Sequence, residues 1–239
     1  MAGGTQSGRN GGPTAVPSGP ASQSGSANAF GQVPSAPTGS DVVLGHGVEG
    51  GGRSVALTFD DGPDPRWTPQ VLALLAQHHA KATFCEIGPL AQRYPYLTKA
   101  VVASGDRLCD HSVHHDEQQS RKPVEYNIRE IVDAKSEITN AAGNGAKLMY
   151  YRAPGGDWSP TIREIAGANH LQPLGWSDDA NDWRRPGVAG ILRNIDQDLR
   201  PGAIILMHDG GGDRSETVQA LARLLSQLDA QGYNYGFPA

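Results

Sequence analysis

Three histidines and two adjacent carboxylates have the residue types and spacing of a metal site. His111, His114 and His115 lie at positions i, i+3 and i+4, so His111 and His115 would share one side of a helical turn and could bind one ion. A carboxylate from Asp60 or Asp61 would complete a set of two histidines and one aspartate, with a position left open for water. Imidazole and carboxylate ligands suit zinc, cobalt, nickel or iron. The other aspartate, left free, could serve as a general base.

A second group of ionisable residues could supply and support an acid. His208 follows an apolar run and is a candidate general acid, with Asp179 or Asp182 as the carboxylate that orients and charges it. Arg152 could hold a buried carboxylate through a bidentate contact. Each pattern also has a plainer interpretation: a solvated histidine turn, a polar Asp-Asp-Gly-Pro turn, a structural histidine or a peripheral ion pair. The catalytic interpretation therefore depends on whether these residues meet.

The elements that carry these residues predict that they do meet. Apolar runs predict strands, and amphipathic stretches between them predict helices. The strands are expected over 55–59, 82–87, 107–109, 147–151, 171–176, 203–207 and 233–237. The helices are expected over 68–79, 89–103, 124–141, 161–168, 188–199 and 215–231. Such alternation implies parallel βαβ units in a barrel or open sheet, whose carboxyl strand ends converge on one face.

The composition separates a leader from one domain. The chain has 239 residues, and 14 of its 31 glycines lie in the first 52. Residues 1–45 are rich in Gly, Ser and Pro and predict a disordered leader or linker, because they cannot bury enough apolar surface to offset their ordering entropy. They lack the pattern of a secretory signal, so we expect a linker left after its removal or a dispensable tail. Residues 46–239 are long enough for one catalytic domain with its own core.

Charge and cysteine content exclude several classes of protein. A net charge of −5, without a run of Lys or Arg, argues against nucleic acid as a partner. No apolar stretch is long enough to cross a bilayer. Two cysteines exclude a disulfide-framed miniprotein and a four-thiolate zinc site. Cys85 and Cys109 lie on consecutive predicted strands, so we expect them to form a disulfide rather than remain buried free thiols. The pair would indicate a secreted or cell-envelope protein, which we expect to be a monomer.

Five short motifs occur in a fixed order along the domain. They are Thr-Phe-Asp-Asp-Gly-Pro at 58–63, His-Ser-x-x-His at 111–115, Arg-Ala-Pro-Gly-Gly at 152–156, Asp-Ala-Asn-Asp-Trp at 179–183 and Leu-Met-His at 206–208. In this order the chain resembles the NodB-type polysaccharide deacetylases, carbohydrate esterase family four, over roughly residues 53–237. The resemblance implies an α/β fold, a distorted (β/α) barrel in a single domain, with fewer strands than the eight of the standard barrel.

The resemblance also implies a role for each motif. It makes Asp60 the general base, held in place by Arg152, and Asp61 a metal ligand together with His111 and His115. The ion would be divalent, zinc first and cobalt or nickel otherwise.

The remaining motifs would complete the site. The resemblance assigns Asp179 to tuning His208 as general acid, Trp183 to the side of the groove and Leu206 to the pocket for the acetyl methyl group. Family members often carry an aromatic residue where this chain has Gly155. Its backbone N–H can still face an oxyanion, but the missing ring opens that wall of the site. Of the other tryptophans, Trp176 is expected in the core.

The expected function is the metal-dependent removal of acetyl groups from polysaccharide. The first expectation is N-acetylglucosamine units of chitin or peptidoglycan, and the alternative is an O-acetyl xylan esterase that uses the same site. A third possibility, of another class, is a non-catalytic glycan-binding module that keeps the fold and the metal. Asp60 and His208 argue against that module, because binding a metal requires neither.

Overall fold

The computed structural model describes residues 1, 44–45, 47–143 and 146–239 of the chain. The predicted leader, residues 1–45, lies almost wholly outside the described residues. The strands are β1 (Ser54–Gly62), β2 (Ala82–Glu86), β3 (Arg107–Asp110), β4 (Leu148–Tyr151), β5 (Gln172–Pro173), β6 (Asp178–Asp179), β7 (Ile204–His208) and β8 (Asn234–Tyr235). The helices are α1 (Thr68–Gln77), α2 (Gly88–Arg93), α3 (Pro95–Ala103), α4 (Val124–Ala142), α5 (Pro160–Ala168), α6 (Val188–Asp198) and α7 (Ser215–Ala230). Among residues 44–45, 47–143 and 146–239, no helix has both the length and the apolar character of a transmembrane span.

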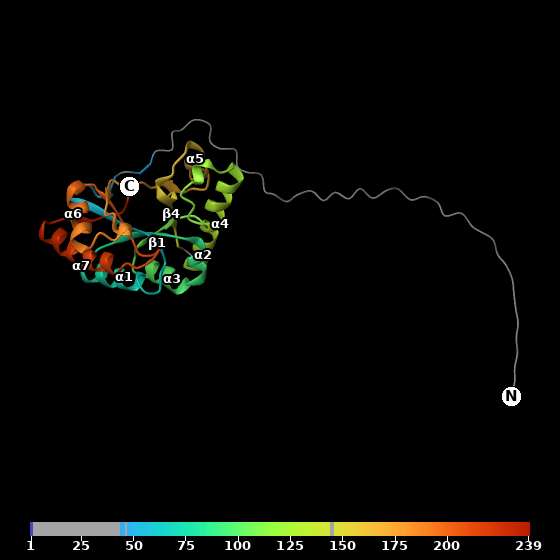
Figure 1. The fold of residues 1–239 in the computed structure, drawn as a ribbon, viewed down its shortest axis with the longest axis horizontal. Coiled ribbons are helices and arrows are strands. Elements are labelled where there is room, and N and C mark those ends of the chain that lie inside the picture. Colours follow the sequence, from blue (N-terminus) through green and yellow to red (C-terminus); the bar gives the residue numbers. More distant parts are fainter. Residues whose placement is uncertain (2–43, 46, 144–145) are drawn as a thin grey trace. The chain divides into compact units, whose positions relative to one another are not determined.

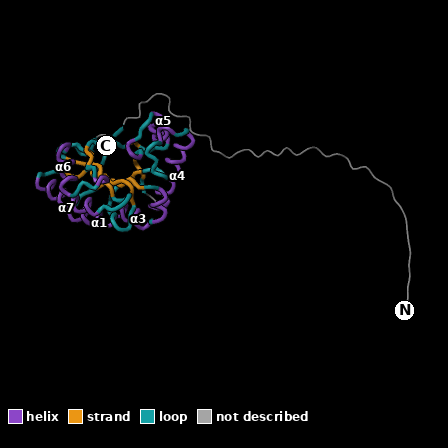
Figure 2. The backbone as a smooth tube through the Cα atoms, viewed as in Figure 1, coloured by secondary structure: helices purple, strands orange, loops and turns teal. Residues whose placement is uncertain are grey.

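The strands form one curled parallel sheet in the order β5-β4-β3-β2-β1-β7-β6, and β8 pairs with the start of β1. Figure 1 and Figure 2 show the strands gathered in the interior with the helices around them. No pairing joins β5 to β6 among the described strands, so the sheet is a barrel left open along one seam. The predicted distorted (β/α) barrel is therefore confirmed.

The alternation of side chains along β1 gives the sheet its two faces. Leu57 and Phe59 are fully buried and pack in the large cluster formed with the helices. Ala56 belongs to the separate cluster on the inner face of the barrel. Because side chains alternate along a strand, Thr58 and Asp60 lie on the same face as Ala56. The central strand thereby places a carboxylate inside the barrel at its carboxyl end.

The helices cover the outer face through apolar stripes. In α7 the buried residues recur at the three- and four-residue spacing of one helix face, and they are Thr217, Ala220, Leu221, Leu224, Leu225 and Leu228. Burying a leucine side chain stabilises the fold by about 1.5–3 kcal/mol, so such a stripe fixes the helix on the sheet. The rigid sheet in turn fixes the ends of its strands.

Two predicted elements differ from the structure. The helix expected over 89–103 is divided into α2 and α3, because Pro95 begins α3 and Tyr94 before it leaves the helical conformation. The strand expected over 171–176 is reduced to the two residues of β5, and β6 follows separately. The intervening chain crosses from one edge of the sheet to the other, and its carbonyls accept hydrogen bonds from a side chain instead of a strand.

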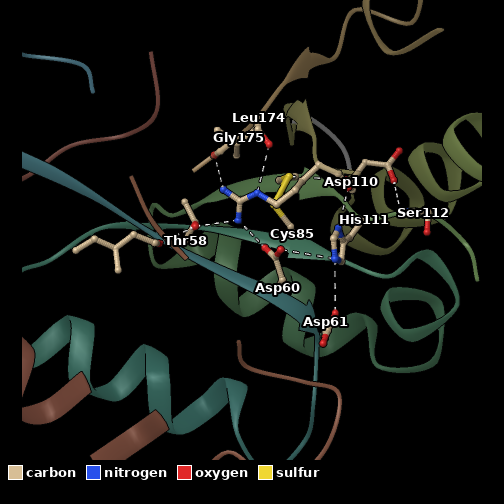
Figure 3. The surroundings of a disulfide bond; sticks show 12 residues. Thr58, Asp60, Asp61, Cys85, Asp110, His111, Ser112, Leu174 and Gly175 are labelled. Carbon is tan, nitrogen blue, oxygen red and sulfur yellow. Dashed lines mark hydrogen bonds and ion pairs between the residues drawn. A yellow bond between two sulfur atoms is a disulfide. The ribbon is translucent and has the colours of Figure 1, made fainter. Parts of the chain in front are cut away.

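A disulfide joins Cys85 in β2 to Cys109 in β3, the pair that the sequence led us to expect. The two residues are direct partners in the parallel pairing of these strands. Both are fully buried on the inner face of the barrel, next to Tyr150 and Leu174. Figure 3 shows the bond among the polar residues at the strand ends, with Asp60 and His111 labelled near it.

Candidate active site

A cavity of about 560 Å³ lies at the carboxyl ends of the strands. It is lined by residues from the ends of β1, β3, β4, β6 and β7, namely Asp60, Asp61, His111, His115, Glu117, Ala153, Gly155, Trp176, Asp179, Trp183, Leu206, His208, Gly211 and Arg214. The lining holds most of the site residues expected from the sequence. Arg152 lies buried behind Asp60, and Asp182 and His114, which the sequence also offered, are outside the lining. The convergence of the motifs on one face is therefore confirmed.

Asp61, His111 and His115 form a possible metal site. Their nearest ligand atoms all lie within 4.8 Å of one another. His111 Nδ1–H donates to the backbone carbonyl of Arg152 at 2.8 Å, so Nε2 carries the lone pair that faces the cavity. Asp61 Oδ1 lies 3.6 Å from His111 Nε2 and 3.1 Å from His115 Nε2. Two imidazole nitrogens and one carboxylate oxygen that share a focus fit a divalent cation.

The electrostatics of Asp61 agree with a cation-binding role. Burial alone would raise the pKa of Asp61, but the hydrogen bond with His115 and the electrostatic interactions with the neighbouring imidazoles outweigh it. Together they hold the pKa of Asp61 well below its usual range. Its carboxylate therefore stays ionised, as a metal ligand must be.

His111 and His115 do not lie on a helical turn, so that part of the prediction is wrong. Residues 111–115 form a loop in which Ser112 and His115 have left-handed backbone angles, with φ of 69° and 51°. The Asp110 carboxylate accepts the N–H of Ser112 at 2.8 Å, and Ser112 Oγ accepts the N–H of His115 at 3.0 Å. Such side-chain-to-backbone bonds compete with helix formation and turn the loop back on itself.

The third histidine of the cluster points to a different partner. His114 Nδ1 lies 2.5 Å from Glu130 Oε1, while Glu130 Oε2 accepts the backbone N–H groups of Val113 and His114 at 3.2 and 2.8 Å. Glu130 is buried in α4 and fastens the histidine loop to that helix. Reasoning from the sequence missed it, although a carboxylate on the otherwise mostly apolar buried stripe of α4 was a visible signal.

Arg152 holds Asp60 in the floor of the cavity. The guanidinium is fully buried and donates to Asp60 Oδ1 at 2.7 Å and to Thr58 Oγ1 at 2.9 Å. It also donates to the carbonyls of Leu174 and Gly175, at 3.4 and 3.0 Å. Figure 3 shows these acceptors around the guanidinium. Asp60 Oδ1 is thus occupied, whereas Oδ2 lies 3.6 Å from His111 Nε2.

His208 is paired with Asp182 and not with Asp179, which corrects the assignment taken from the resemblance. His208 Nδ1–H donates to Asp182 Oδ1 at 2.7 Å, and the backbone N–H of His208 donates to Oδ2 at 2.9 Å. Asp179 lines the cavity, but its carboxylate accepts the backbone N–H of Asn181 at 2.8 Å. Burial alone would lower the pKa of His208, but the hydrogen bond and charge of Asp182 outweigh it and raise the pKa to about 9. The ring is therefore charged at neutral pH.

Apolar residues complete the walls of the cavity. Leu206 is almost buried, and Trp183 is 49% exposed at the rim, with the guanidinium of Arg184 over its ring. Trp176 is half-buried: it packs against the inner core cluster, as expected, but it also lines the cavity. Its ring centroid lies 5.6 Å from the Arg152 guanidinium carbon. Gly155 leaves the facing wall without a ring.

Comparison with known proteins places these features in a family. The family model described as polysaccharide deacetylase matches residues 47–174. A peptidoglycan-N-acetylglucosamine deacetylase of Bacillus cereus is 40% identical over 185 residues, which cover 77% of this chain and 85% of the relative. A chitooligosaccharide deacetylase of Sinorhizobium fredii is 37% identical over 195 residues, covering 77% and 89%.

A solved structure shares the fold. It is a pseudoenzyme of carbohydrate esterase family four from Bacillus anthracis, with a TM-score of 0.71 and 25% identity. The match covers 77% of this chain and 63% of that one, so the chain spans less than two thirds of its length. The predicted enzyme class rests on the curated relatives, which are named deacetylases. A family match over more than half of the residues, with relatives of 40% and 37% identity, shows that this chain belongs to the polysaccharide deacetylase family.

Proposed function

We propose that this protein hydrolyses the acetamide of N-acetylglucosamine units in chitin-type or peptidoglycan chains. One observation carries the proposal: Asp60, fixed by Arg152, and His208, charged by Asp182, line the same cavity as the Asp61-His111-His115 set. A base, an acid and a cation site in one cavity are what metal-assisted amide hydrolysis requires. The names of the two curated relatives support the choice of N-acetylglucosamine.

Asp61, His111 and His115 would hold the cation, and zinc is the ion that we propose, with cobalt or nickel as substitutes. When bound, such an ion lowers the pKa of water from ~15.7 towards ~7 and polarises a carbonyl oxygen. The hydrogen bond from His111 Nδ1–H to the Arg152 carbonyl fixes the tautomer that presents Nε2.

Asp60 accepts the proton of the attacking water through Oδ2, since Oδ1 is held by Arg152. The buried guanidinium keeps the carboxylate oriented until the proton arrives. Gly155 and Leu206 line the cavity. We assign the backbone N–H of Gly155 to the carbonyl oxygen as negative charge develops on it, and Leu206 to the wall around the acetyl methyl group. A donor in the position of Gly155 typically contributes roughly 10²–10³ in rate.

His208 delivers the proton that the departing amine needs. Its Nδ1–H is engaged by Asp182, so Nε2–H of the charged ring is the proton available to the substrate. The raised pKa of about 9 keeps the ring protonated at neutral pH, ready to act as an acid. Trp183 at the rim offers a flat surface on which a sugar ring can stack.

Two other functions use the same framework. An O-acetyl xylan esterase would need the same base and cation but depend less on His208, because an alkoxide leaves more readily than an amide anion. A glycan-binding module would keep the metal set alone. The Bacillus anthracis pseudoenzyme shows that this fold does not imply activity. The base and the acid, each with its supporting partner, favour catalysis here.

Acetate release decides among these functions. The purified chain would be incubated with chitin oligomers, peptidoglycan and acetylated xylan, first with a chelator and then with zinc, cobalt or nickel restored. We expect metal-dependent release from the N-acetylated glycans. Release from xylan alone would support the esterase, and glycan binding without release from any substrate would support the binding module.

The domain boundaries and the location are part of the same proposal. Residues 46–239 would be the catalytic domain and residues 1–45 a leader or linker. The Cys85–Cys109 disulfide supports a secreted or cell-envelope location, because such bonds persist in oxidising compartments. We further propose that the protein acts as a monomer.

A further inference from the structure

Three ionisable side chains of the cavity wall have no part in the proposed chemistry: Glu117, Asp179 and Arg214. Asp179 accepts a backbone N–H, and Arg214 donates to two backbone carbonyls. Within the described part of the chain, the Glu117 carboxylate makes no hydrogen bond or ion pair, and the residue is exposed. Glu117 is therefore a free negative charge at the edge of the cavity.

The neighbouring acidic residues are all compensated. Asp116 pairs with Lys122 Nζ at 3.1 Å. Asp157 accepts the N–H and the hydroxyl of Ser120 at 2.6 and 2.7 Å. Asp116 and Asp157, which lie outside the cavity lining, are thus paired within the protein, whereas the carboxylate of Glu117 is available to a ligand in the cavity.

Gly155 explains why Glu117 can stand where it does. Gly155 has a φ of +60°, and a Cβ built on it would lie 3.1 Å from Glu117 Cγ and 3.2 Å from Glu117 Cβ. A side chain at position 155 would therefore compete with Glu117 for the same space. Since the N–H of Gly155 is the group that we place at the acetyl carbonyl, the Glu117 side chain lies beside the reacting sugar.

We propose that Glu117 binds the ammonium group of a glucosamine unit next to the unit being deacetylated, a proposal that rests on the function proposed above. A free carboxylate attracts an ammonium group and repels the lactyl carboxylate of a muramic acid unit. Glu117 would therefore favour a neighbouring glucosamine unit and disfavour a neighbouring muramic acid unit. Each turnover converts a neutral acetamide into an amine. The product of one reaction would thus make the neighbouring unit a better substrate.

Three oligomers that differ in one sugar test the proposal. The unit next to the reacting one would be N-acetylglucosamine, glucosamine or N-acetylmuramic acid, assayed at about pH 6, where the sugar amine is protonated. We expect kcat/KM of the wild type to be highest with glucosamine and lowest with muramic acid. In Glu117→Gln the glucosamine preference should fall about two- to fivefold, and the muramic acid penalty should shrink by a similar factor. Because each protein is compared with itself on the three oligomers, a general loss of activity in Glu117→Gln does not change these ratios of kcat/KM.

Glu164→Gln is the matched control, because Glu164 is an exposed carboxylate of α5 outside the cavity lining. It should keep the wild-type ratios, and high salt should reduce the ratios of the wild type. Equal ratios in the wild type and Glu117→Gln, or an equal change in Glu164→Gln, would overturn the proposal. If no oligomer releases acetate, the proposed function fails. Calorimetry with a glucosamine oligomer then still decides the inference: Glu117→Gln should bind it about two- to fivefold more weakly, and unchanged affinity would overturn it.

Discussion

Asp182 accepts two hydrogen bonds from His208, one from the ring Nδ1–H at 2.7 Å and one from the backbone N–H at 2.9 Å. The Thr217 hydroxyl donates a third, at 2.8 Å to Oδ2. Asp182 is almost fully buried, so its charge acts on the imidazole with little screening by solvent. The pair therefore fixes both the direction in which Nε2 points and the charge of the ring.

Replacing Asp182 should remove the charge of His208 at neutral pH. In the wild type, activity should fall as the pH rises through about 9, because the ring then loses the proton that it donates. In Asp182→Asn this alkaline limb should move towards the ordinary histidine pKa near 6.5, so that at pH 7.5 only about a tenth of the rings stay protonated. Asp179→Asn is the control and should keep the limb of the wild type. A pH–rate profile of kcat for the three proteins checks this, and a shift in Asp179→Asn alone would contradict it.

Substitution of each of the two adjacent aspartates should have a different effect. Asp61→Asn should lose both metal and turnover, since a neutral amide oxygen is a poor ligand. Asp60→Asn should keep the metal and lose about 10²–10⁴ in turnover, because an amide cannot accept the proton of water. Elemental analysis and acetate release on the same samples make the comparison. A fully active Asp60→Asn protein would disprove the assigned base.

Glu130 should influence the affinity for metal without touching the ion. Glu130→Gln keeps the shape of the side chain but removes the negative charge that holds His114 and two backbone N–H groups. The histidine loop would then be less well ordered, and affinity for zinc should fall about 10–100-fold, as is typical of residues that support metal ligands. Calorimetric titration with zinc measures this. Glu125→Gln, at an exposed position of the same helix, should bind zinc like the wild type.

Glu86 should make the fold less stable as the pH rises. Glu86 is fully buried, and burial raises its pKa from 4.5 to about 8, although a hydrogen bond from Thr98 partly opposes this. The folded protein thus keeps a proton that the unfolded chain releases, so the free energy of unfolding falls between about pH 4.5 and 8. Glu86→Gln should flatten this dependence and be the more stable protein at pH 8. Denaturant melts at several pH values test it, and parallel curves for the two proteins would refute it.

The disulfide should contribute mainly to stability. In the chain-entropy model, a bond that closes a loop of this length stabilises by about 3.5 kcal/mol. Substituting Cys85 and Cys109 by alanine together should lower the free energy of unfolding by roughly that amount and leave kcat of the folded protein within a few-fold of the wild type. Urea titration and acetate release measure the two effects. A stability equal to that of the wild type would contradict the expectation.

The sequence predicted the features that depend on the periodicity of side chains along strands and helices. It did not predict side-chain pairings between residues that meet only in the folded protein. Alternation in β1 and the polar residues after each strand placed Asp60 and His208 correctly at one face. The pairing of His208 with Asp182 depends on a turn around Asn181, which has a left-handed φ of 49° and brings Asp182 under the ring. No spacing rule distinguishes that geometry from one with Asp179.

The prediction of a helical turn at residues 111–115 was wrong for a related reason. A spacing of four residues is the signature of a helix, but hydrogen bonds from Asp110 and Ser112 favour a turn instead. His111 and His115 still meet, since a turn of this kind and a helix can both place two side chains on the same side. Their proximity was thus predicted, although the backbone that brings them together differs from the predicted one.

Arg152 connects the open seam of the barrel to the floor of the candidate active site. Its guanidinium donates to the carbonyls of Leu174 and Gly175, on the segment between β5 and β6, and to Asp60 and Thr58 at the end of β1. A single buried side chain thus ties the segment that crosses the open seam to the central strand of the sheet. Heat or denaturant that detaches the segment between β5 and β6 should therefore also release the Asp60 carboxylate. We expect thermal inactivation to begin at this seam, so that the strength of the contacts of one arginine sets the temperature at which activity is lost.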